Sequence, residues 1–496
     1  MIAIKISKIA ELTGNKYWPS QKDRNITSLC YDSRKAVAGS AFFCIAGAIS
    51  DGHDYAMSAY ERGCRVFICE RMPRGFPLRG AKVFIAQQGV RAALADIAAE
   101  FYGHPEKEMR LIGITGTKGK TTTAHFVASI LNKSGIKTGY IGTNGVDFDN
   151  CHYDTLNTTP ESCDLYEYLA MMLSKKVKTA VIEVSSQALM LGRVRNIVFD
   201  TCVFTNLYLD HIGGVEHPTF ENYRECKMLL FSQHCGRYAL INADSPESDS
   251  FAAVTSSHVK KVIYSTERPT DIYSENASLT RGENGPGTKF SLCHKGDSCS
   301  VELGLPGLFN ISNALAAASV CLIYGVPLEK IADAISDTKI SGRFETVHIN
   351  GVDFIIDYAH NGESLRSVLS VLRCYEPNRL ICLFGSVGGR TQMRRAELGS
   401  VASELADYSI ITSDNPDCEP PTQIIDEIAE QYKHPYNYIK ITDRREAILH
   451  AISIAKAGDI VLLAGKGHES YQLICGKRVP FSEREILQTA KELSLI

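Results

Sequence analysis

The segment Leu111-Ile-Gly-Ile-Thr-Gly-Thr-Lys-Gly-Lys-Thr-Thr-Thr123 decides the fold around it. Its first five residues form the apolar run of a buried parallel strand. The stretch that follows is amphipathic to about Lys133, where Gly135 suits a helix end, and so predicts a helix. Glycines at such a strand-to-helix turn let backbone N–H groups surround a phosphate group at the helix N-terminus. Lys120 would add a positive charge, and the Thr121 hydroxyl could bind Mg²⁺.

This glycine-rich segment departs from the usual phosphate-loop pattern G-x-x-x-x-G-K-[ST], because Ile114 occupies the first glycine position. An ordinary strand-to-helix turn is therefore the alternative. The lysine and threonine at positions 120 and 121 stand in the register that phosphate binding needs, and they favour a nucleotide site.

Composition narrows the class of protein. The chain has 496 residues, of which 44% are hydrophobic and 22% charged, so a globular protein of about three domains is expected rather than a disordered or fibrous one. The formal net charge of −3 gives no general reason to bind nucleic acid or a membrane. We find neither a signal peptide nor an apolar stretch of membrane-spanning length, so we expect a cytoplasmic protein. The sixteen cysteines contain no C-x-x-C pair, and we expect them to be reduced and mostly buried.

Short runs of Val, Ile and Phe alternate with longer helical patterns, which predicts α/β domains with parallel sheets. In such sheets ligands bind beyond the carboxyl ends of the strands, and seven apolar runs here end in polar or glycine-rich residues. Turn-rich segments at 103–107 and 340–343 indicate two linkers. We therefore predict domains at 1–107, 108–340 and 341–496, and surface loops and hairpins at 267–300.

Three polar residues beyond the glycine-rich segment are candidates for metal binding. Glu183 ends an apolar strand and could hold Mg²⁺ through its carboxylate, while a capping or turn role is equally open. His211 follows Asp210 in a predicted turn and could bind a second metal, although an isolated histidine is more often structural. Lys227 lies in a predicted helix at 223–231, where a lysine on the solvated face is the usual case.

Nine spaced motifs together give the chain a resemblance to a known family. They are Thr115–Thr122, Asn157-Thr-Thr-Pro160, Glu183–Leu189, Asp210-His211, Glu221–Lys227, Gly342-Arg-Phe-Glu345, Asp357-Tyr-Ala-His360, Asp414-Asn-Pro416 and Gly465-Lys-Gly-His-Glu469. In this order, and over nearly the whole chain, they resemble the bacterial Mur ligases. The resemblance implies three α/β domains: an N-terminal UDP-binding domain, a central P-loop ATPase with a parallel sheet, and a C-terminal Rossmann-like domain that binds an amino acid.

The resemblance also assigns residues to ATP and its metal ions. The residues implied to bind ATP are Gly116, Thr117, Lys118, Gly119, Lys120, Thr121, Thr122, Asn310, Asn313, Arg343 and Asp357. The implied catalytic residues are Lys120, Glu183, His211 and Lys227. Two Mg²⁺ ions would be held by Thr121, Glu183, His211 and Lys227, the lysine being modified by CO₂ to a carbamate.

The substrates follow from the same resemblance. The residues implied to bind UDP-N-acetylmuramoyl-L-alanyl-D-glutamate are Ser33, Asn157, Thr158, Thr159, Ser185 and Arg193. Those implied to bind the incoming amino acid are Arg390, Asp414, Asn415, Pro416, Asp417, Gly465 and Glu469. ATP would phosphorylate the D-glutamate γ-carboxylate, and the amine of a diamino acid would displace phosphate from the acyl phosphate. The product would be a peptidoglycan precursor, made by a protein that we expect to be a monomer.

Residue 417 bears on the choice of diamino acid. Family members that add diaminopimelate read Asp-Asn-Pro-Arg here, and the arginine pairs with the distal carboxylate of that substrate. Asp417 would repel such a carboxylate and attract the ammonium group of lysine, so we expect L-lysine. Alternatively, Asp417 caps the helix that begins near Pro420. Gln187 stands where many relatives have His, and Gly389 and Ala396 depart from the diaminopimelate type, which leaves L-lysine, D-lysine, ornithine and diaminopimelate open.

Two other functions remain open from the sequence. A folylpolyglutamate-synthase-like ligase would share the ATP chemistry, but the segments Asp32-Ser-Arg34 and Asp414-Asn-Pro416 argue against it. A P-loop ATPase that acts as a binding module would turn over ATP without the other substrates and would not need Lys227.

Overall fold

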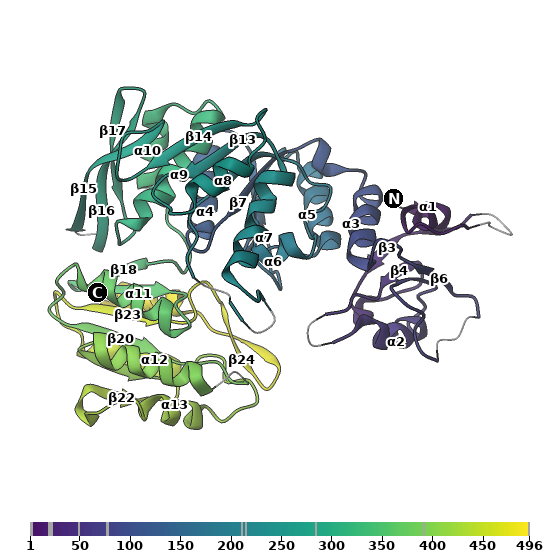
Figure 1. Ribbon diagram of the computed structural model, residues 1–496. Helices are drawn as coiled ribbons and strands as arrows, with labels where there is room; N and C mark the ends of the chain where they lie inside the picture. The colour runs from purple at the N-terminus through teal and green to yellow at the C-terminus, as the bar shows by residue number, and fades with distance from the viewer. Residues whose placement is uncertain are drawn as a thin grey trace. The chain divides into compact units, whose positions relative to one another are not determined.

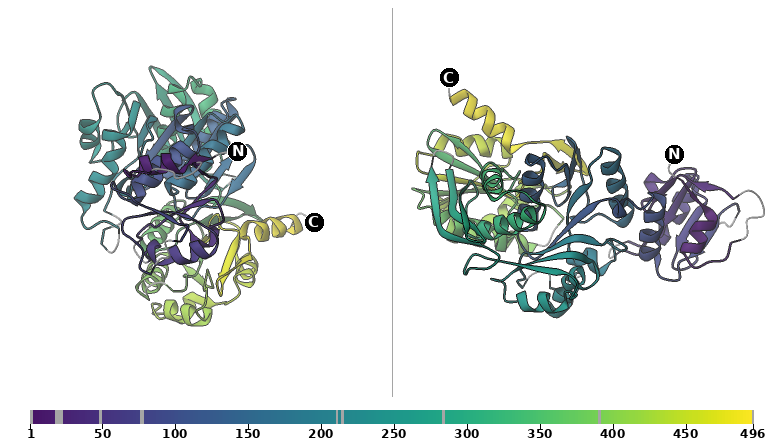
Figure 2. Two further views of the ribbon diagram at one scale, coloured as in Figure 1. Left: turned by 90° about the vertical axis from the view of Figure 1, so that its right-hand side faces the viewer. Right: turned by 90° about the horizontal axis from the view of Figure 1, so that it is seen from above.

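The computed structural model of the protein describes residues 3–17, 23–47, 50–75, 79–209, 212–213, 216–282, 285–389 and 392–494 (Figures 1 and 2). The chain forms two compact units, one of residues 1–265 with 316–326 and the other of residues 266–315 with 327–496. Within the described ranges, no helix is both long enough and apolar enough to cross a membrane.

The first unit begins with a four-stranded parallel sheet. In spatial order its strands are β3 (Ser28–Cys30), β4 (Ser40–Phe43), β5 (Val66–Cys69) and β6 (Lys82–Ile85). An antiparallel pair, β1 (Ile4–Lys5) and β2 (Asn25–Ile26), lies outside this sheet. The helices of this part are α1 (Ile6–Leu12), η1 (Ser33–Lys35), η2 (Gly52–Tyr55), α2 (Ala56–Glu61), α3 (Val90–Phe101) and η3 (Pro105–Lys107).

The rest of the first unit is built around β7 (Arg110–Thr115). From one edge the strands are β10 (Cys151–Tyr153), β9 (Gly145–Phe148), β8 (Thr138–Gly142), β11 (Thr179–Glu183), β7, β12 (Phe199–Phe204), β13 (Cys235–Asn242) and β14 (Lys260–Ser265). The strands from β8 to β14 are parallel, whereas β9 and β10 are antiparallel. Its helices are α4 (Lys120–Lys133), α5 (Ser162–Ser174), α6 (Ser186–Met190), α7 (Phe220–Gln233) and α8 (Ser248–Val254).

This strand order matters for function because β7 lies between β11 and β12. The polar residues that follow these three strands therefore meet at one edge of the sheet. Helix α4 has the predicted extent, and Gly135, whose φ is 82°, follows its end. The prediction of a helix around residue 227 is also confirmed, by α7.

The second unit contains three long antiparallel strands: β15 (Ile272–Gly282), β16 (Gly285–His294) and β17 (Asp297–Leu303). They cover the segment for which we predicted loops and hairpins. The hairpins are present, but most of β15 is exposed, so it lacks the apolar alternation that would reveal a strand. Helix α10 (Leu328–Ser336) packs on β17, and α9 (Phe309–Ile323) contributes residues to both units.

A six-stranded sheet forms the rest of the second unit. Its spatial order is β18 (Glu345–Ile349), β19 (Val352–Asp357), β23 (Ile460–Ala464), β20 (Leu380–Phe384), β21 (Tyr408–Ile411) and β22 (Tyr438–Lys440), with only β18 antiparallel among these paired strands. Its helices are α11 (Gly362–Arg373), α12 (Gln392–Leu405), α13 (Pro421–Ala429), η4 (Pro435–Asn437), α14 (Arg444–Ile454) and α15 (Glu483–Ser494). A hairpin of β24 (Tyr471–Ile474) and β25 (Lys477–Pro480) follows β23.

The predicted α/β class with parallel sheets is confirmed. One apolar core links the N-terminal and central sheets of the first unit, and a separate core fills the six-stranded sheet. The predicted domain boundaries near residues 107 and 340 stay predictions.

Candidate active site

The glycine-rich segment forms a tight loop between β7 and α4. Gly116 has a φ of 153°, and a Cβ atom there would lie 2.0 Å from Oγ1 of Thr205. Gly119, with a φ of 84°, immediately precedes the helix. The backbone N–H groups of a first helical turn have no partner within the helix, and in other proteins such groups bind anions.

Residues after β12 hold this loop in place, and sequence reasoning assigned them no role. The backbone N–H of Lys118 donates to Oδ1 of Asn206 (2.9 Å), and the backbone N–H of Thr117 donates to the Asn206 carbonyl (2.9 Å). The Asn206 amide and the Thr205 hydroxyl both donate to the carbonyl of Lys118, at 3.0 and 2.8 Å. One feature of the sequence could have revealed this role: Thr205 and Asn206 directly follow an apolar run.

Two lysines converge on one carbonyl of the loop. Nζ of Lys120 donates to the carbonyl oxygens of Gly116 (2.8 Å) and Thr117 (3.0 Å). Nζ of Lys227, on α7, donates to the same Gly116 oxygen at 2.8 Å and lies 4.5 Å from the centre of the Tyr223 ring. Lys227 is only 1% exposed, so the solvated-face alternative is wrong.

Glu183 is a fully buried carboxylate at the end of β11. Its Oε1 accepts from the Tyr140 hydroxyl (2.6 Å) and the Thr143 N–H (3.0 Å), while Oε2 accepts from the hydroxyls of Thr121 (2.9 Å) and Thr143 (3.3 Å). Burial, followed by the nearby Glu183 charge, raises the pKa of Tyr140 well above its ordinary value, so this phenol stays a donor.

The Thr121–Glu183 pair is suited to a hard cation. A hydroxyl and a carboxylate oxygen 2.9 Å apart are oxygen ligands of the kind Mg²⁺ prefers. No cluster of three or more His, Cys, Asp or Glu that could hold a metal occurs in the part of the chain that the structure describes. His211 lies outside the described residues.

Four of the residues implied to bind the UDP substrate lie next to Glu183. The Thr159 hydroxyl donates to the Glu183 carbonyl (2.7 Å) and accepts from the Ser185 N–H (3.0 Å). Arg193 donates to the Thr159 carbonyl at 3.1 Å, and the hydroxyls of Thr158 and Thr143 lie 3.1 Å apart.

The other two residues of that set are placed differently. Asn157 is half-buried in the loop between β10 and α5. Ser33 is buried in η1, in the N-terminal part of the unit. Arg193 itself is buried and also bonds to Oε1 of Glu161 at 2.9 Å.

Four of the residues implied to bind ATP lie in the second unit: Asn310, Asn313, Arg343 and Asp357. The Asn313 amide donates to Oδ1 of Asn310 (3.0 Å), whose own amide donates to the Pro306 carbonyl (2.8 Å). Asp357 accepts from the N–H groups of Phe344 (3.0 Å) and Ala359 (2.9 Å), and burial raises its pKa. The Arg343 guanidinium lies 5.5 Å from the centre of the Tyr358 ring.

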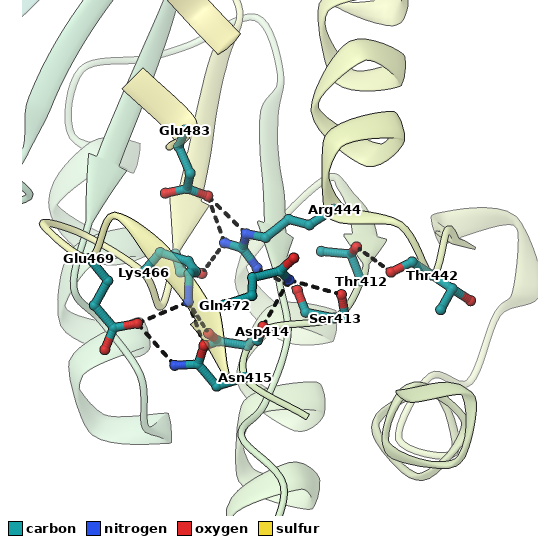
Figure 3. A network of polar contacts seen from close by, with 11 residues as sticks. Thr412, Ser413, Asp414, Asn415, Thr442, Arg444, Lys466, Glu469, Gln472 and Glu483 are labelled. Carbon is teal, nitrogen blue, oxygen red and sulfur yellow. Dashed lines mark hydrogen bonds and ion pairs between the residues drawn. The ribbon is translucent and has the colours of Figure 1, made fainter. Parts of the chain in front are cut away.

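The acceptor segment after β21 is organised by Lys466, a residue that we did not assign (Figure 3). The Lys466 ammonium is fully buried and donates to Oδ1 of Asn415 (2.7 Å) and Oε2 of Glu469 (2.9 Å), with Oδ1 of Asp414 at 3.4 Å. The Asn415 amide donates to the same Glu469 oxygen at 2.9 Å. Gly465 has a φ of 111°, and a Cβ there would lie 2.7 Å from Oδ2 of Asp414.

Asp417 joins this segment to the β24–β25 hairpin. Its N–H donates to the Leu473 carbonyl (2.9 Å), and its Oδ1 accepts from the Gly476 N–H (2.7 Å). Helix α13 begins at Pro421 without a side-chain cap, so the alternative that Asp417 caps this helix is wrong. Pro416 approaches Gly388 so closely that a Cβ at Gly388 would lie 2.0 Å from the Pro416 carbonyl oxygen. Arg390, which follows this glycine pair, lies outside the described residues.

A buried ion pair lies beside the segment and bonds to its backbone (Figure 3). The Arg444 guanidinium donates to Oε1 of Glu483 (2.9 Å) and to the carbonyls of Ser413 (3.1 Å) and Ala464 (2.8 Å). Burial raises the pKa of Glu483, and the Arg444 charge opposes that effect. Sequence reasoning missed Arg444, because nothing local distinguishes it from its neighbour Arg445.

Comparison with known proteins then identifies the family. Three family models match the chain. The model described as "Mur ligase family, catalytic domain" matches residues 25–102, and the model of the Mur ligase middle domain matches residues 114–321. The model described as "Mur ligase, glutamate ligase domain" matches residues 342–467. A UDP-N-acetylmuramoyl-L-alanyl-D-glutamate--2,6-diaminopimelate ligase of Bacillus licheniformis is 40% identical over 501 residues, covering 98% of this chain and 99% of the relative. The chain belongs to the Mur ligase family.

Two further comparisons agree with this Mur ligase assignment. The UDP-N-acetylmuramoyl-L-alanyl-D-glutamate--2,6-diaminopimelate ligase 1 of Clostridium acetobutylicum is 39% identical and covers 94% of this chain and 95% of its own. A solved structure of a UDP-N-acetylmuramoyl-L-alanyl-D-glutamate--2,6-diaminopimelate ligase superposes with a TM-score of 0.67. The sequence identity is 27%, and the match covers all of both chains. The predicted three-domain Mur ligase fold is confirmed.

This Mur ligase is an ATP-dependent acid–amino-acid ligase of peptidoglycan synthesis, as expected. The relatives named above are 2,6-diaminopimelate ligases, so they do not support the lysine acceptor that we expected from Asp417. The implied roles of the individual site residues stay predictions.

Proposed function

We propose that this Mur ligase activates the D-glutamate γ-carboxylate of UDP-N-acetylmuramoyl-L-alanyl-D-glutamate with ATP and joins a diamino acid to it. The observation that carries the proposal is the convergence of Lys120 and Lys227 on the Gly116 carbonyl, within a loop bordered by buried Glu183. Lys120 would supply the positive charge that a phosphoryl transfer needs, and Lys227 lies beside it, where a carbamate could hold a metal ion.

The chain itself mainly positions and screens the reacting groups. In the proposed reaction Lys120 turns from the Gly116 carbonyl toward phosphate oxygens, while Asn206 keeps the loop in shape. Bound ATP and Mg²⁺ supply the phosphoryl group and neutralise charge. Thr121 and Glu183 would hold one Mg²⁺; His211 and a carbamate on Lys227 would hold the second.

The remaining assignments complete the proposal. Residues 1–107 would bind the UDP group, 108–340 ATP and 341–496 the amino acid, in a cytoplasmic monomer. Thr158, Thr159, Ser185 and Arg193 would contact the UDP substrate beside Glu183, with Ser33 and Asn157 contributing from other segments. Asn310, Asn313, Arg343 and Asp357 would contact the adenine nucleotide.

For the acceptor we propose meso-diaminopimelate, since relatives 39–40% identical over almost the whole chain carry 2,6-diaminopimelate in their names. Lysine is the second candidate, because the carboxylate of Asp417 is held at the position where the diaminopimelate type has arginine. In both cases Glu469 would bind an ammonium group of the acceptor, because Lys466 and Asn415 occupy its Oε2 and leave Oε1 to face the substrate.

A ligation assay tests this proposal. The purified protein is mixed with ATP, Mg²⁺, UDP-N-acetylmuramoyl-L-alanyl-D-glutamate and one amino acid at a time: meso-diaminopimelate, L-lysine, D-lysine or ornithine. Mass spectrometry should detect a UDP-tripeptide, with the best kcat/KM for meso-diaminopimelate. A better value for lysine would establish the second candidate. Release of ADP with none of these acceptors joined would refute the ligase proposal and favour an ATPase module.

A further inference from the structure

The three most exposed cysteines of the chain include two that are spatial neighbours. All sixteen cysteines are free thiols in the structure, and all sixteen fall within its described ranges. Eleven are buried, whereas Cys374, Cys418 and Cys475 are exposed. Cys418 follows Asp417 in the acceptor segment, and Cys475 forms the tip of the β24–β25 hairpin.

Backbone pairing brings the two thiols together. Asp417 and Ile474 form a parallel β-bridge, in which the Asp417 N–H donates to the Leu473 carbonyl (2.9 Å) and the Cys475 N–H donates to the Asp417 carbonyl (2.8 Å). Cys418 and Cys475 are the next residues on the two sides of this bridge. Neighbouring backbones in such a ladder are about 5 Å apart, within the range of about 4.4–6.8 Å between Cα atoms that a disulfide spans.

The side chains share one environment. Cys418 and Cys475 line the same open hollow beside Pro416 and Gln472. The Oδ1 of Asp417 accepts from the Gly476 N–H (2.7 Å) and lies 3.7 Å from Sγ of Cys418, which fixes the hairpin tip against the segment.

We propose that Cys418 and Cys475 are a redox modification site that closes to a disulfide by exchange with a small-molecule disulfide. The thiolate of one cysteine attacks the reagent and releases one thiol. The second cysteine then attacks the mixed disulfide and releases the other thiol. The protein loses two electrons and two protons, and one reagent disulfide becomes two thiols.

The chain supplies internal controls for this proposal. Sγ of Cys44 lies 3.4 Å from Sγ of Cys69, but both residues are completely buried, so proximity without access should leave them reduced. Cys374 is exposed on the end of α11 and donates to the Ser370 carbonyl, so access without a neighbouring thiol should give only a mixed disulfide. The Asp417 charge raises the pKa of the Cys418 thiol, which should slow the first step without preventing the bond.

The bond would have a consequence that rests on the proposed function. It would tie the hairpin that carries Gln472 and Leu473 to the segment that presents Asn415. Loss of movement at this point should hinder acceptor entry and leave ATP binding at the phosphate loop, which belongs to the other unit, unaffected.

Peptide mapping tests the bond itself and needs no substrate. The folded protein is treated with oxidised glutathione, alkylated and digested with trypsin without reduction. We expect peptides 396–433 and 467–477, each of which contains a single cysteine, to appear as one linked species lacking two hydrogen atoms. Cys418→Ser should abolish this species and leave Cys475 glutathionylated, and Cys475→Ser should do the converse. Glutathione on both cysteines of the unmutated protein, or no reaction at either while Cys374 reacts, would overturn the proposal.

Kinetics test the consequence separately. In the oxidised protein we expect the KM for the amino acid to rise at least threefold, with the KM for ATP unchanged, and both to return on reduction. Cys418→Ser treated with reductant after oxidation serves as the matched control. An unchanged acceptor KM in a fully linked protein would refute the effect on acceptor entry, whereas an untreated protein that forms no UDP-tripeptide would show that the proposed function has failed.

Discussion

The loop after β7 and the segment after β21 both use a buried lysine, but the hydrogen bonds described for these lysines end on different kinds of group. The hydrogen bonds described for Lys120 and Lys227 end on the uncharged carbonyls of Gly116 and Thr117. Those of Lys466 end on Asn415 and Glu469, with Asp414 close by. The first arrangement holds ammonium groups on the backbone of the phosphate loop, whereas the second uses one to fix carboxylates in place.

Replacing Lys120 by Met should produce the largest effect. Loss of the positive charge at the phosphate loop should lower kcat by about 1000-fold, because charge developing on the phosphoryl group loses a positioned partner. Steady-state ligation assays measure this loss. The matched control is Lys133→Met, an exposed lysine at the other end of the same helix, which should retain full activity. Similar losses in both variants would mean that the helix, and not the charge at the loop, is being tested.

Lys227→Ala should lower activity by about 100-fold, the range seen when support for a bound metal is lost. Depleting CO₂ from the unmutated protein should lower its activity too, and bicarbonate should restore it. The same treatment should leave Lys227→Ala unchanged. Full activity of the variant at ordinary bicarbonate would remove Lys227 from the mechanism and leave Lys120 as the relevant cation of the loop.

Lys466→Met should raise the KM for the amino acid about tenfold, because Glu469 and Asn415 lose their shared donor. The KM for ATP should not change. If Lys466 acts through Glu469, adding Glu469→Gln should cause little further loss, and a double-mutant cycle measures this coupling. Asn415→Leu probes the same contact should Lys466→Met fail to fold. If Lys466→Met and Glu469→Gln instead raise the KM for the amino acid additively, Lys466 has only a structural role.

Asp417→Arg should produce the smallest effect, a shift of about fivefold in kcat/KM from lysine toward meso-diaminopimelate, as expected for a partly exposed charge pair. Competition between the two amino acids, followed by mass spectrometry, measures the ratio. Asp417→Asn is the control, because it removes the charge and can still accept from the Gly476 N–H. Equal ratios in all three proteins would exclude residue 417 as a determinant of acceptor choice.

Local patterns in the sequence predicted the strand, glycine loop and helix at 111–133, because each of these elements depends on its own residues and their immediate neighbours. The same reasoning placed Glu183 at a strand end and Lys227 on a helix. The resemblance to Mur ligases then assigned roles that spacing alone could not.

Only the tertiary structure decided which of these residues meet. The order β8-β11-β7-β12 is not sequential, so it brings Asn206 and Glu183 to opposite sides of one loop, and it buries Lys227 against Gly116. The three-way bonding of Lys466 and the support from Arg444 likewise depend on contacts between distant segments. Local sequence preferences determine the helices and strands. The charge balance of a site depends instead on residues that become neighbours only when the chain folds.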